Sequence, residues 1–220
     1  MKFIFIFLFS NLVFLPAHAG VFLELLPGTE KIYRGRAPQP FEMRQIRDAG
    51  VTSVLIFKNQ IKSEVDEEVS QLMRAGIDEK KIHNIPFLWK DFSSERLACE
   101  QVIEALQIMQ EVQNSENDKI LFHCTVGEDR TGLLAGLMTQ LLEIEDTEQS
   151  FVNQMCAKGY AGGNANKPRK VIAAVDQFLT PLYFKISRLI EAGLLSSDNL
   201  NKRVCARMSD EVAISASRCQ

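Results

Sequence analysis

The sequence predicts an α/β fold with a central, mostly parallel sheet flanked by helices. The first observation is that short runs of consecutive apolar residues, typical of strands buried on both faces, recur along the chain. The second is that longer stretches of helical period lie between these runs, several of them ended by glycine or a polar turn. Strands that alternate with helices in this way are usually parallel neighbours in one sheet.

The first part of the chain predicts two strands, each preceded by a helix. A helix over 42–50 ends at a glycine, and the strand 51–57 follows it with four consecutive apolar residues in VTSVLIF. A polar helix over 63–76 has its apolar side chains on one side and also ends at a glycine. The sequence KKIHNIPF then predicts a second strand over 80–87, closed by Pro86.

The middle of the chain predicts a long helix, a third strand and a buried helix. The long helix covers 93–113, and either Ser93 or Ser94 can cap its start. The strand 119–124, KILFHC, is followed by the apolar pattern 131–143, which indicates a helix buried on all sides. Further helices are predicted over 147–159 and 169–193, with a flexible loop over 161–168.

The sequence predicts a signal peptide, one domain long enough to form a full hydrophobic core, and a tail. Residues 1–19 have Lys2, a short apolar run and a final Ala-His-Ala, which is typical of a signal peptide cleaved after Ala19. The apolar run is too short to span a bilayer, which needs about 20 residues. We therefore expect an exported protein, periplasmic or secreted, that is free of the membrane after cleavage. Residues 20–195 form the domain, and 196–220 form a polar tail.

Composition argues against several classes of function. The net charge is −3 and no basic stripe is visible, so nucleic-acid binding is not expected. The chain has five cysteines without a CxxC pair and three histidines, so we expect neither a zinc ribbon nor a thioredoxin-like site. We expect no metal and no cofactor. The sequence carries no indication of the oligomeric state.

The loop in FHCTVGEDRTG, residues 122–132, combines a nucleophile with a site for an anion. Cys124 ends a predicted strand and Thr131 begins a predicted helix, so backbone N–H groups converge near a helix N-terminus. Gly127 permits the tight turn, and the guanidinium of Arg130 can contact two phosphate oxygens. The same positive field lowers the pKa of the Cys124 thiol, and Thr131 can hydrogen-bond the sulfur. This arrangement predicts attack of sulfur on phosphorus and a phosphocysteine intermediate.

Another chemistry is a papain-like pair of Cys124 with His83. It leaves Arg130 and the glycine spacing unexplained, so we interpret His83 as an ordinary strand residue.

The stretch HCTVGEDRTG resembles the His-Cys-x5-Arg-(Ser/Thr) signature of the cysteine-based protein tyrosine phosphatase superfamily. IYRGRAPQP is similar to the Tyr-Arg-x-x-x-Pro entry strand of bacterial dual-specificity-like members. The resemblance extends over about 32–159 and includes the tyrosine-phosphatase-like phytase branch. It implies a tyrosine or dual-specificity phosphatase-like fold for the predicted sheet.

The resemblance also implies roles for individual residues. IPFLWKDF stands where the family carries its mobile general-acid loop, so Asp91 matches the acid; the alternative is that Asp91 is an N-cap or a solvated loop residue. Glu128 and Asp129 are rival carboxylates within the loop. His123 is expected to steady the loop by a hydrogen bond to its backbone. The implied substrate-binding residues are Thr125, Val126, Gly127, Glu128, Asp129, Arg130, Lys58 and Lys90, with Cys124, Arg130, Asp91 and Thr131 catalytic.

Glu128 departs from the family pattern, since many relatives have lysine, glycine or a small residue there. Its charge weakens the positive field at the loop and counts against highly charged substrates. Trp89 is expected either to wall the pocket or to pack in the core. Five cations in or beside loops can face the same edge, or else lie on solvated surface: Lys58, Lys90, Lys167, Arg169 and Lys170.

The predicted function is an exported cysteine-dependent phosphomonoester hydrolase. By analogy with exported relatives, the leading substrate class is inositol polyphosphates such as phytate. The alternatives are a protein tyrosine or dual-specificity phosphatase, and a pseudophosphatase that binds phosphorylated ligands without turnover.

In the tail, a Cys205–Cys219 disulfide is expected to contribute about 3 kcal/mol to stability, with Cys99 and Cys156 as buried thiols.

Overall fold

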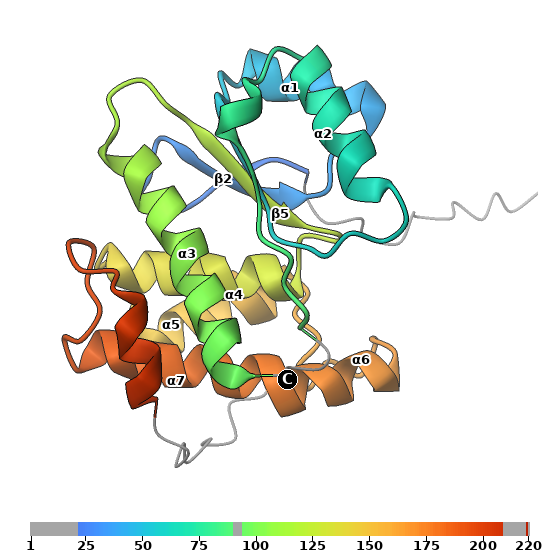
Figure 1. The fold of residues 1–220 in the computed structure, drawn as a ribbon. Coiled ribbons are helices and arrows are strands. Elements are labelled where there is room, and N and C mark those ends of the chain that lie inside the picture. Colours follow the sequence, from blue (N-terminus) through green and yellow to red (C-terminus); the bar gives the residue numbers. More distant parts are fainter. Residues whose placement is uncertain (1–21, 90–93, 209–218, 220) are drawn as a thin grey trace, which may run out of the picture.

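The computed structural model describes residues 22–89, 94–208 and 219, and its described part contains one five-stranded sheet (Figure 1). The strand order is β1-β2-β5-β3-β4, in which only β1 is antiparallel to its neighbour. The predicted α/β fold with a mostly parallel sheet is therefore confirmed. The strands are β1 Glu24–Leu25, β2 Ile32–Arg36, β3 Ser53–Ile56, β4 Ile82–Asn84 and β5 Ile120–Cys124.

Helices cover both faces of the sheet (Figure 1). Helices α1 and α2 pack on one face, where Leu121 of β5 joins their apolar side chains. Helices α3, α4 and α7 pack on the other face, where Ile120 and Phe122 of β5 enter the larger core. This alternation along β5 places His123 toward α2 and Cys124 toward α4. The helices are α1 Met43–Asp48, α2 Glu64–Arg74, α3 Glu95–Asn114, α4 Asp129–Leu141, α5 Thr147–Ser150, α6 Arg169–Ala174 and α7 Thr180–Glu191.

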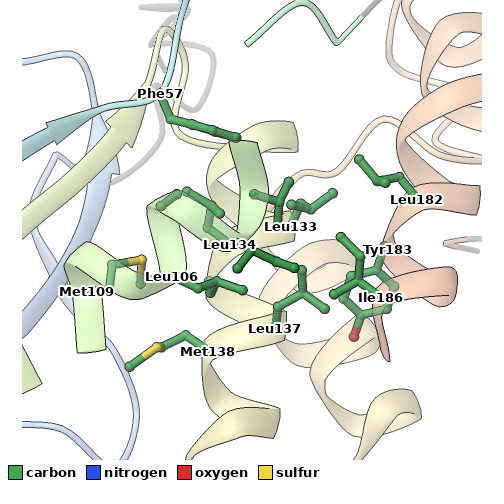
Figure 2. Close-up of a cluster of buried hydrophobic side chains, with 14 of the residues drawn as sticks. Phe57, Leu106, Met109, Leu133, Leu134, Leu137, Met138, Leu182, Tyr183 and Ile186 are labelled. Atoms are coloured by element: carbon green, nitrogen blue, oxygen red, sulfur yellow. The ribbon is translucent and has the colours of Figure 1, made fainter. Parts of the chain in front are cut away.

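Helix α4 is the centre of the larger core, and every one of its residues is buried. In Figure 2, its side chains Leu133, Leu134, Leu137 and Met138 lie among Leu106 and Met109 of α3 and Leu182, Tyr183 and Ile186 of α7. The prediction of a helix buried on all sides is therefore confirmed. Because α4 is fully enclosed, its first turn, which carries the end of the signature loop, is held rigidly against the sheet.

Most predicted elements are present, with two changes in the helices after α4. The predicted helix 147–159 is split into α5, a π-helical turn Phe151–Met155 and a 3₁₀ turn that ends at Gly159, whose φ is 86°. The predicted helix 169–193 is interrupted by a second π-helical turn, Val175–Leu179. Ser94 caps α3, since its side chain accepts a hydrogen bond from the N–H of Leu97. Among the described residues, no helix has the length and apolar character needed to cross a membrane.

The disulfides differ from the expectation. Cys205 is bonded to Cys99, with 5.8 Å between their Cα atoms, and Cys219 is bonded to Cys156. The expected Cys205–Cys219 bridge is therefore wrong, and so is the expectation of two buried thiols on helices. The reason is that a 3₁₀ helix, Lys202–Arg207, packs against α3 and brings Cys205 to it. Cys124 is the free cysteine.

Candidate active site

The signature loop crosses the carboxyl end of β5, between its parallel neighbours β2 and β3. Cys124 is the last residue of β5, and α4 begins at Asp129. Gly127 has a φ of 76°, and a Cβ there would lie 2.7 Å from the backbone of Gly35 and Arg36. Only glycine fits this position, both for its backbone conformation and for its contact with β2. The loop therefore lies where ligands bind in parallel sheets.

Cys124 is 1% exposed, and the groups around it favour the thiolate. Its backbone N–H donates to Oγ1 of Thr131 at 3.0 Å. Burial raises the pKa of the Cys124 thiol, but the charge of Arg130 and hydrogen bonds from Thr131 and Gly127 outweigh burial, so that the pKa lies below its ordinary value. The structure thus places Cys124 and Thr131 together as the sequence predicted.

Arg130 is held at the same loop by two contacts. Its guanidinium donates to Oγ1 of Thr125 at 3.1 Å, and its Cζ lies 5.8 Å from the centre of the Trp89 ring. Trp89 also packs against the larger core, so both interpretations of this residue hold. A guanidinium stacked on an indole and bonded to the loop has a restricted orientation, which suits it to hold a phosphate group in one position.

A cleft of about 670 Å³ opens over this loop, and most of its exposed lining is apolar. Three large apolar side chains at its rim are unusually exposed: Ile61 at 59%, Leu88 at 60% and Val126 at 48%. Trp89, Pro168 and Val171 complete the apolar lining. Exposed apolar side chains that gather at one opening commonly mark a ligand-binding groove.

Two of the lysines expected to face the substrate are paired with carboxylates. Lys58 is 5% exposed, and its Nζ lies 2.8 Å from Oε2 of Glu68 on α2. Lys167 forms an ion pair with Glu128. Both lysines line the cleft, but their charges are largely balanced by these partners. Arg169 and Lys170, at the start of α6, are exposed, whereas Lys90 lies outside the described residues.

The two carboxylates of the loop hold a neighbouring segment. Oδ1 of Asp129 accepts a hydrogen bond from the N–H of Ala161 at 2.8 Å, and burial raises the pKa of the Asp129 carboxyl above its ordinary value. Glu128 reaches Lys167 across Gly159, where a Cβ would lie 3.0 Å from the Glu128 carboxylate. Both carboxylates therefore anchor residues 159–167 to the loop. Asp91, the matching general acid, lies outside the described residues and stays a prediction.

His123 is fully buried and contacts the loop backbone, as the resemblance implied. Its Nδ1 lies 3.0 Å from the carbonyl oxygen of Cys124, and its Nε2 lies 2.7 Å from Oε1 of Glu68. His83 is on β4, and β3 separates that strand from β5, so the structure does not bring His83 to Cys124. Among the described residues, no group of three or more His, Cys, Asp or Glu side chains is placed to hold a metal ion.

Sequence reasoning missed Glu68. Its signal was a glutamate on the apolar side of the predicted helix, three residues after Val65 and four before Leu72. A carboxylate on a buried face is rarely present without a partner. Its partners are Lys58, which follows β3, and His123, which is on β5, and they could be identified only in the folded chain.

Comparisons with known proteins agree with this geometry. A sequence model of the tyrosine phosphatase family matches residues 29–149, which is more than half of the 220-residue chain. A tyrosine-protein phosphatase of Nostoc commune is 40% identical over 42 residues, or 19% of this chain. The matched stretch spans only 14% of the length of that curated relative.

Solved structures with a similar fold include the PTP-2 phosphatase of Cydia pomonella and the catalytic core of Siw14. The first is 16% identical with a TM-score of 0.50, covering 71% of this chain and 89% of that one. The second is 20% identical with a TM-score of 0.50, covering 84% of this chain and 90% of that one. At these identities the likeness concerns the fold.

Proposed function

Because the chain belongs to the tyrosine phosphatase family, we propose that it hydrolyses phosphate monoesters through a phosphocysteine intermediate. The observation that carries the proposal is the loop itself. A cysteine with a lowered pKa ends β5, and Arg130 and the first turn of α4 close the same loop around it. This arrangement supplies a nucleophile and an anion site within one turn of chain.

The reaction follows in two steps. In the first, the thiolate of Cys124 attacks phosphorus, the bond to the ester oxygen breaks, and that oxygen leaves with a proton from the general acid. In the second, water attacks the phosphocysteine and gives a proton to the carboxylate of the general acid, the sulfur–phosphorus bond breaks, and phosphate leaves as the thiolate is restored. Arg130 and the loop N–H groups hold the oxygens that carry the developing negative charge. Asp91 is our proposed acid, by its place before α3 in the sequence.

Of the two substrate classes, aryl phosphates such as phosphotyrosine are the better supported. The cleft is walled by apolar side chains, and its two described lysines, Lys58 and Lys167, are paired with glutamates. An aromatic ring suits such a wall, because its burial is favourable by about 25 cal/mol per Å². A ligand with six phosphate groups would need unpaired cations in the cleft instead.

Inositol polyphosphates remain a second candidate on one observation. Arg169 and Lys170 are exposed directly after Pro168, which lines the cleft, and in the described part of the chain neither is paired with a carboxylate. These two cations can contact phosphate groups outside the central loop.

We also propose export to an oxidising compartment, which the two disulfides support, since such bonds are rare in the cytosol.

The test is a phosphate-release panel on the mature protein: a phosphotyrosine peptide, a nitrophenyl phosphate and inositol hexakisphosphate. We expect kcat/KM to be highest for the aryl substrates. Cys124→Ser should lose turnover on every substrate while still binding phosphate, since Arg130 and the loop N–H groups remain. Turnover by Cys124→Ser would contradict the phosphocysteine mechanism. Binding without turnover by the wild type would identify a pseudophosphatase, and faster release from inositol hexakisphosphate would reverse the order of substrates.

A further inference from the structure

A hollow of about 330 Å³ lies between α1 and α2, which pack side by side on one face of the sheet (Figure 1). Arg44 and Arg47, three positions apart on α1, line it together with Arg74 at the end of α2. Its other lining residues in the described part of the chain are uncharged: Pro40, Met43, Gln71 and Ala75. Three arginines thus gather at one place in a chain with 28 acidic and 25 basic residues. They form no stripe in the sequence because they come from two helices.

The charges of these arginines are poorly balanced within the protein. Arg44 pairs with Asp48 at 3.3 Å, but the two side chains are 80% and 60% exposed, and ion pairs so exposed contribute little. Among the described residues, neither Arg47 nor Arg74 forms an ion pair. Like charges around one hollow repel each other, so an anion placed between them is stabilised. The hollow therefore suits a negatively charged group.

Exposed apolar side chains border the hollow on both helices. Phe41, next to the lining residue Pro40, is 77% exposed, and Met73, next to Arg74, is 43% exposed. Aromatic residues, methionine and arginine are the types enriched at protein–protein interfaces. A small polyanion would use the arginines alone, whereas a polypeptide would also cover the apolar side chains. The composition of this surface therefore favours an acidic segment of a polypeptide.

A second hollow, of about 260 Å³, connects the arginines to the cleft over the signature loop. It shares Pro40 and Gln71 with the hollow of the arginines, and it shares Lys58 and Thr125 with the cleft. The three hollows therefore follow one another across the surface.

One face of α2 lines the route from the second hollow to the arginines. Residues at positions 64, 67, 68, 71, 74 and 75, which are three or four apart, line one hollow or the other. Glu64 and Arg74 are ten positions apart on this helix, a rise of about 15 Å. An extended peptide covers that length with about five residues. A polypeptide with its phosphorylated residue in the cleft can thus reach the arginines.

The charge changes sign along this route. Glu64 and Glu67, both exposed, line the second hollow, whereas the hollow beyond it is lined by the arginines. A ligand with uniform negative charge would be repelled at the glutamates before it reached the arginines. A polypeptide can place neutral or basic side chains over the glutamates and acidic ones over the arginines.

We propose that the hollow lined by Arg44, Arg47 and Arg74 is a docking site for an acidic segment of a phosphorylated polypeptide substrate. The segment lies about five or more residues from the residue that loses its phosphate. This inference rests on the proposed function, because it places the phosphorylated residue of the same polypeptide in the cleft. Docking lowers KM for such substrates and leaves the attacking groups alone, since the hollow and the cleft share no lining residue.

The experiment compares phosphotyrosine peptides on the mature full chain. Each pair is identical except for three glutamates or three glutamines placed five to eight residues from the phosphotyrosine, on its N-terminal side in one pair and its C-terminal side in the other. In one of the two directions we expect KM to be about three- to tenfold lower for the glutamate peptide. The double variant Arg47→Gln/Arg74→Gln should bring the ratio of the two KM values to about one, because both unpaired charges are gone.

Arg203→Gln/Arg207→Gln is the matched control. It also removes two exposed arginines, from the 3₁₀ helix that packs on α3, on the opposite face of the sheet from α1 and α2. It should keep the wild-type ratio. A ratio of one in the wild type in both directions, or an equal loss in the control, would overturn the proposal.

A second measurement needs no turnover. The unphosphorylated glutamate peptide is titrated into nitrogen-15-labelled protein, and we expect amide shifts in α1 and the last turn of α2 that disappear in Arg47→Gln/Arg74→Gln. Absence of these shifts would contradict docking. If nitrophenyl phosphate is hydrolysed but the peptides do not differ, the inference fails and the proposed function holds. If no substrate is hydrolysed but the shifts appear, the proposed function fails and docking of an acidic segment holds.

Anionic lipid headgroups offer these arginines the same charge, and sedimentation with vesicles distinguishes them from a peptide. We expect no binding to phosphatidylcholine vesicles that contain phosphatidylserine. Binding that Arg47→Gln/Arg74→Gln abolishes, together with equal KM values for the peptides, would overturn the proposal and assign this surface to a membrane.

Discussion

Lys167 forms an ion pair with Glu128 beside the signature loop, so each charge neutralises most of the other's electrostatic effect on a substrate. Glu128 was the one residue of the loop that departed from the family pattern. In the structure Glu128 has a clear role, because the pair joins the loop to Lys167, which lines the cleft together with Pro168 and Val171. The balance of charge at the mouth therefore depends on two residues that are 39 positions apart in the sequence.

Breaking this pair from either side should have opposite effects on binding. Glu128→Gln frees Lys167 and should lower KM for inositol hexakisphosphate by about three- to tenfold, the effect of about 1 kcal/mol from one added charge. Lys167→Gln leaves Glu128 unpaired and should raise KM for the same substrate by a similar factor. Initial rates on this substrate and on an aryl phosphate decide the matter, with Glu148→Gln on the exposed surface as control. Equal changes on both substrates would argue against a charge effect.

Arg130→Lys should lower kcat on every substrate by about 10²- to 10³-fold, the usual effect of removing one transition-state donor. An ammonium can neither contact two phosphate oxygens in parallel nor stack in the same way on Trp89. Single-turnover rates should fall as much as kcat, because formation of the phosphocysteine is the step affected. A variant with normal kcat and raised KM would assign Arg130 to ground-state binding alone.

The pH profile of kcat/KM should be bell-shaped. The acidic limb follows formation of the Cys124 thiolate, and since the pKa of this thiol is lowered, that limb should lie below the ordinary range of cysteine. The alkaline limb follows loss of the proton from the general acid. Asp91→Asn should remove the alkaline limb and slow an alkyl phosphate by about 10²- to 10⁴-fold, with a much smaller loss for a nitrophenyl phosphate.

Asp129→Asn is the control for this assignment, since its carboxylate is bonded to the N–H of Ala161. It should keep the alkaline limb. If the alkaline limb is lost in Asp129→Asn but kept in Asp91→Asn, Asp129 and not Asp91 is the general acid.

The two disulfides should differ in what their loss does to activity. Each closes a long loop, and the chain-entropy model gives about 4 to 5 kcal/mol for either bond. Replacing Cys99 and Cys205 by serine should lower the free energy of unfolding in urea and leave kcat/KM unchanged, because this bond joins α3 to the tail away from the cleft. Peptide mapping without reductant should first recover both pairs. Recovery of a Cys205–Cys219 peptide would contradict the structure.

Replacing Cys156 and Cys219 by serine should also raise KM. The N–H of Cys219 donates to the carbonyl of Gly162 at 3.2 Å, and the neighbouring Ala161 is bonded to Asp129. Loss of the bond therefore loosens the segment that Glu128 and Asp129 hold. An unchanged KM would show that those two carboxylates suffice.

The sequence by itself determined the alternation of strands with helices and the chemistry of the signature loop, because both depend on residues that are close together in the chain. Four consecutive apolar residues predict a buried strand wherever they stand, and a cysteine five positions before Arg130, between a strand and a helix, has its neighbours supplied by the chain itself. Gly127 could likewise be interpreted from its neighbours alone. For these features the interacting groups lie within about one turn of each other.

Only the tertiary structure decided the features that join distant segments. Glu68 meets His123 because α2 packs on the face of the sheet to which alternation along β5 directs that ring. The disulfides follow from where the tail lies on α3 and near Gly162, which no spacing of cysteines encodes. The number of residues between two positions restricts their distance in space only when the two positions are close in sequence. For the remaining pairs, packing of the two faces of the sheet brings the charges and sulfurs into contact.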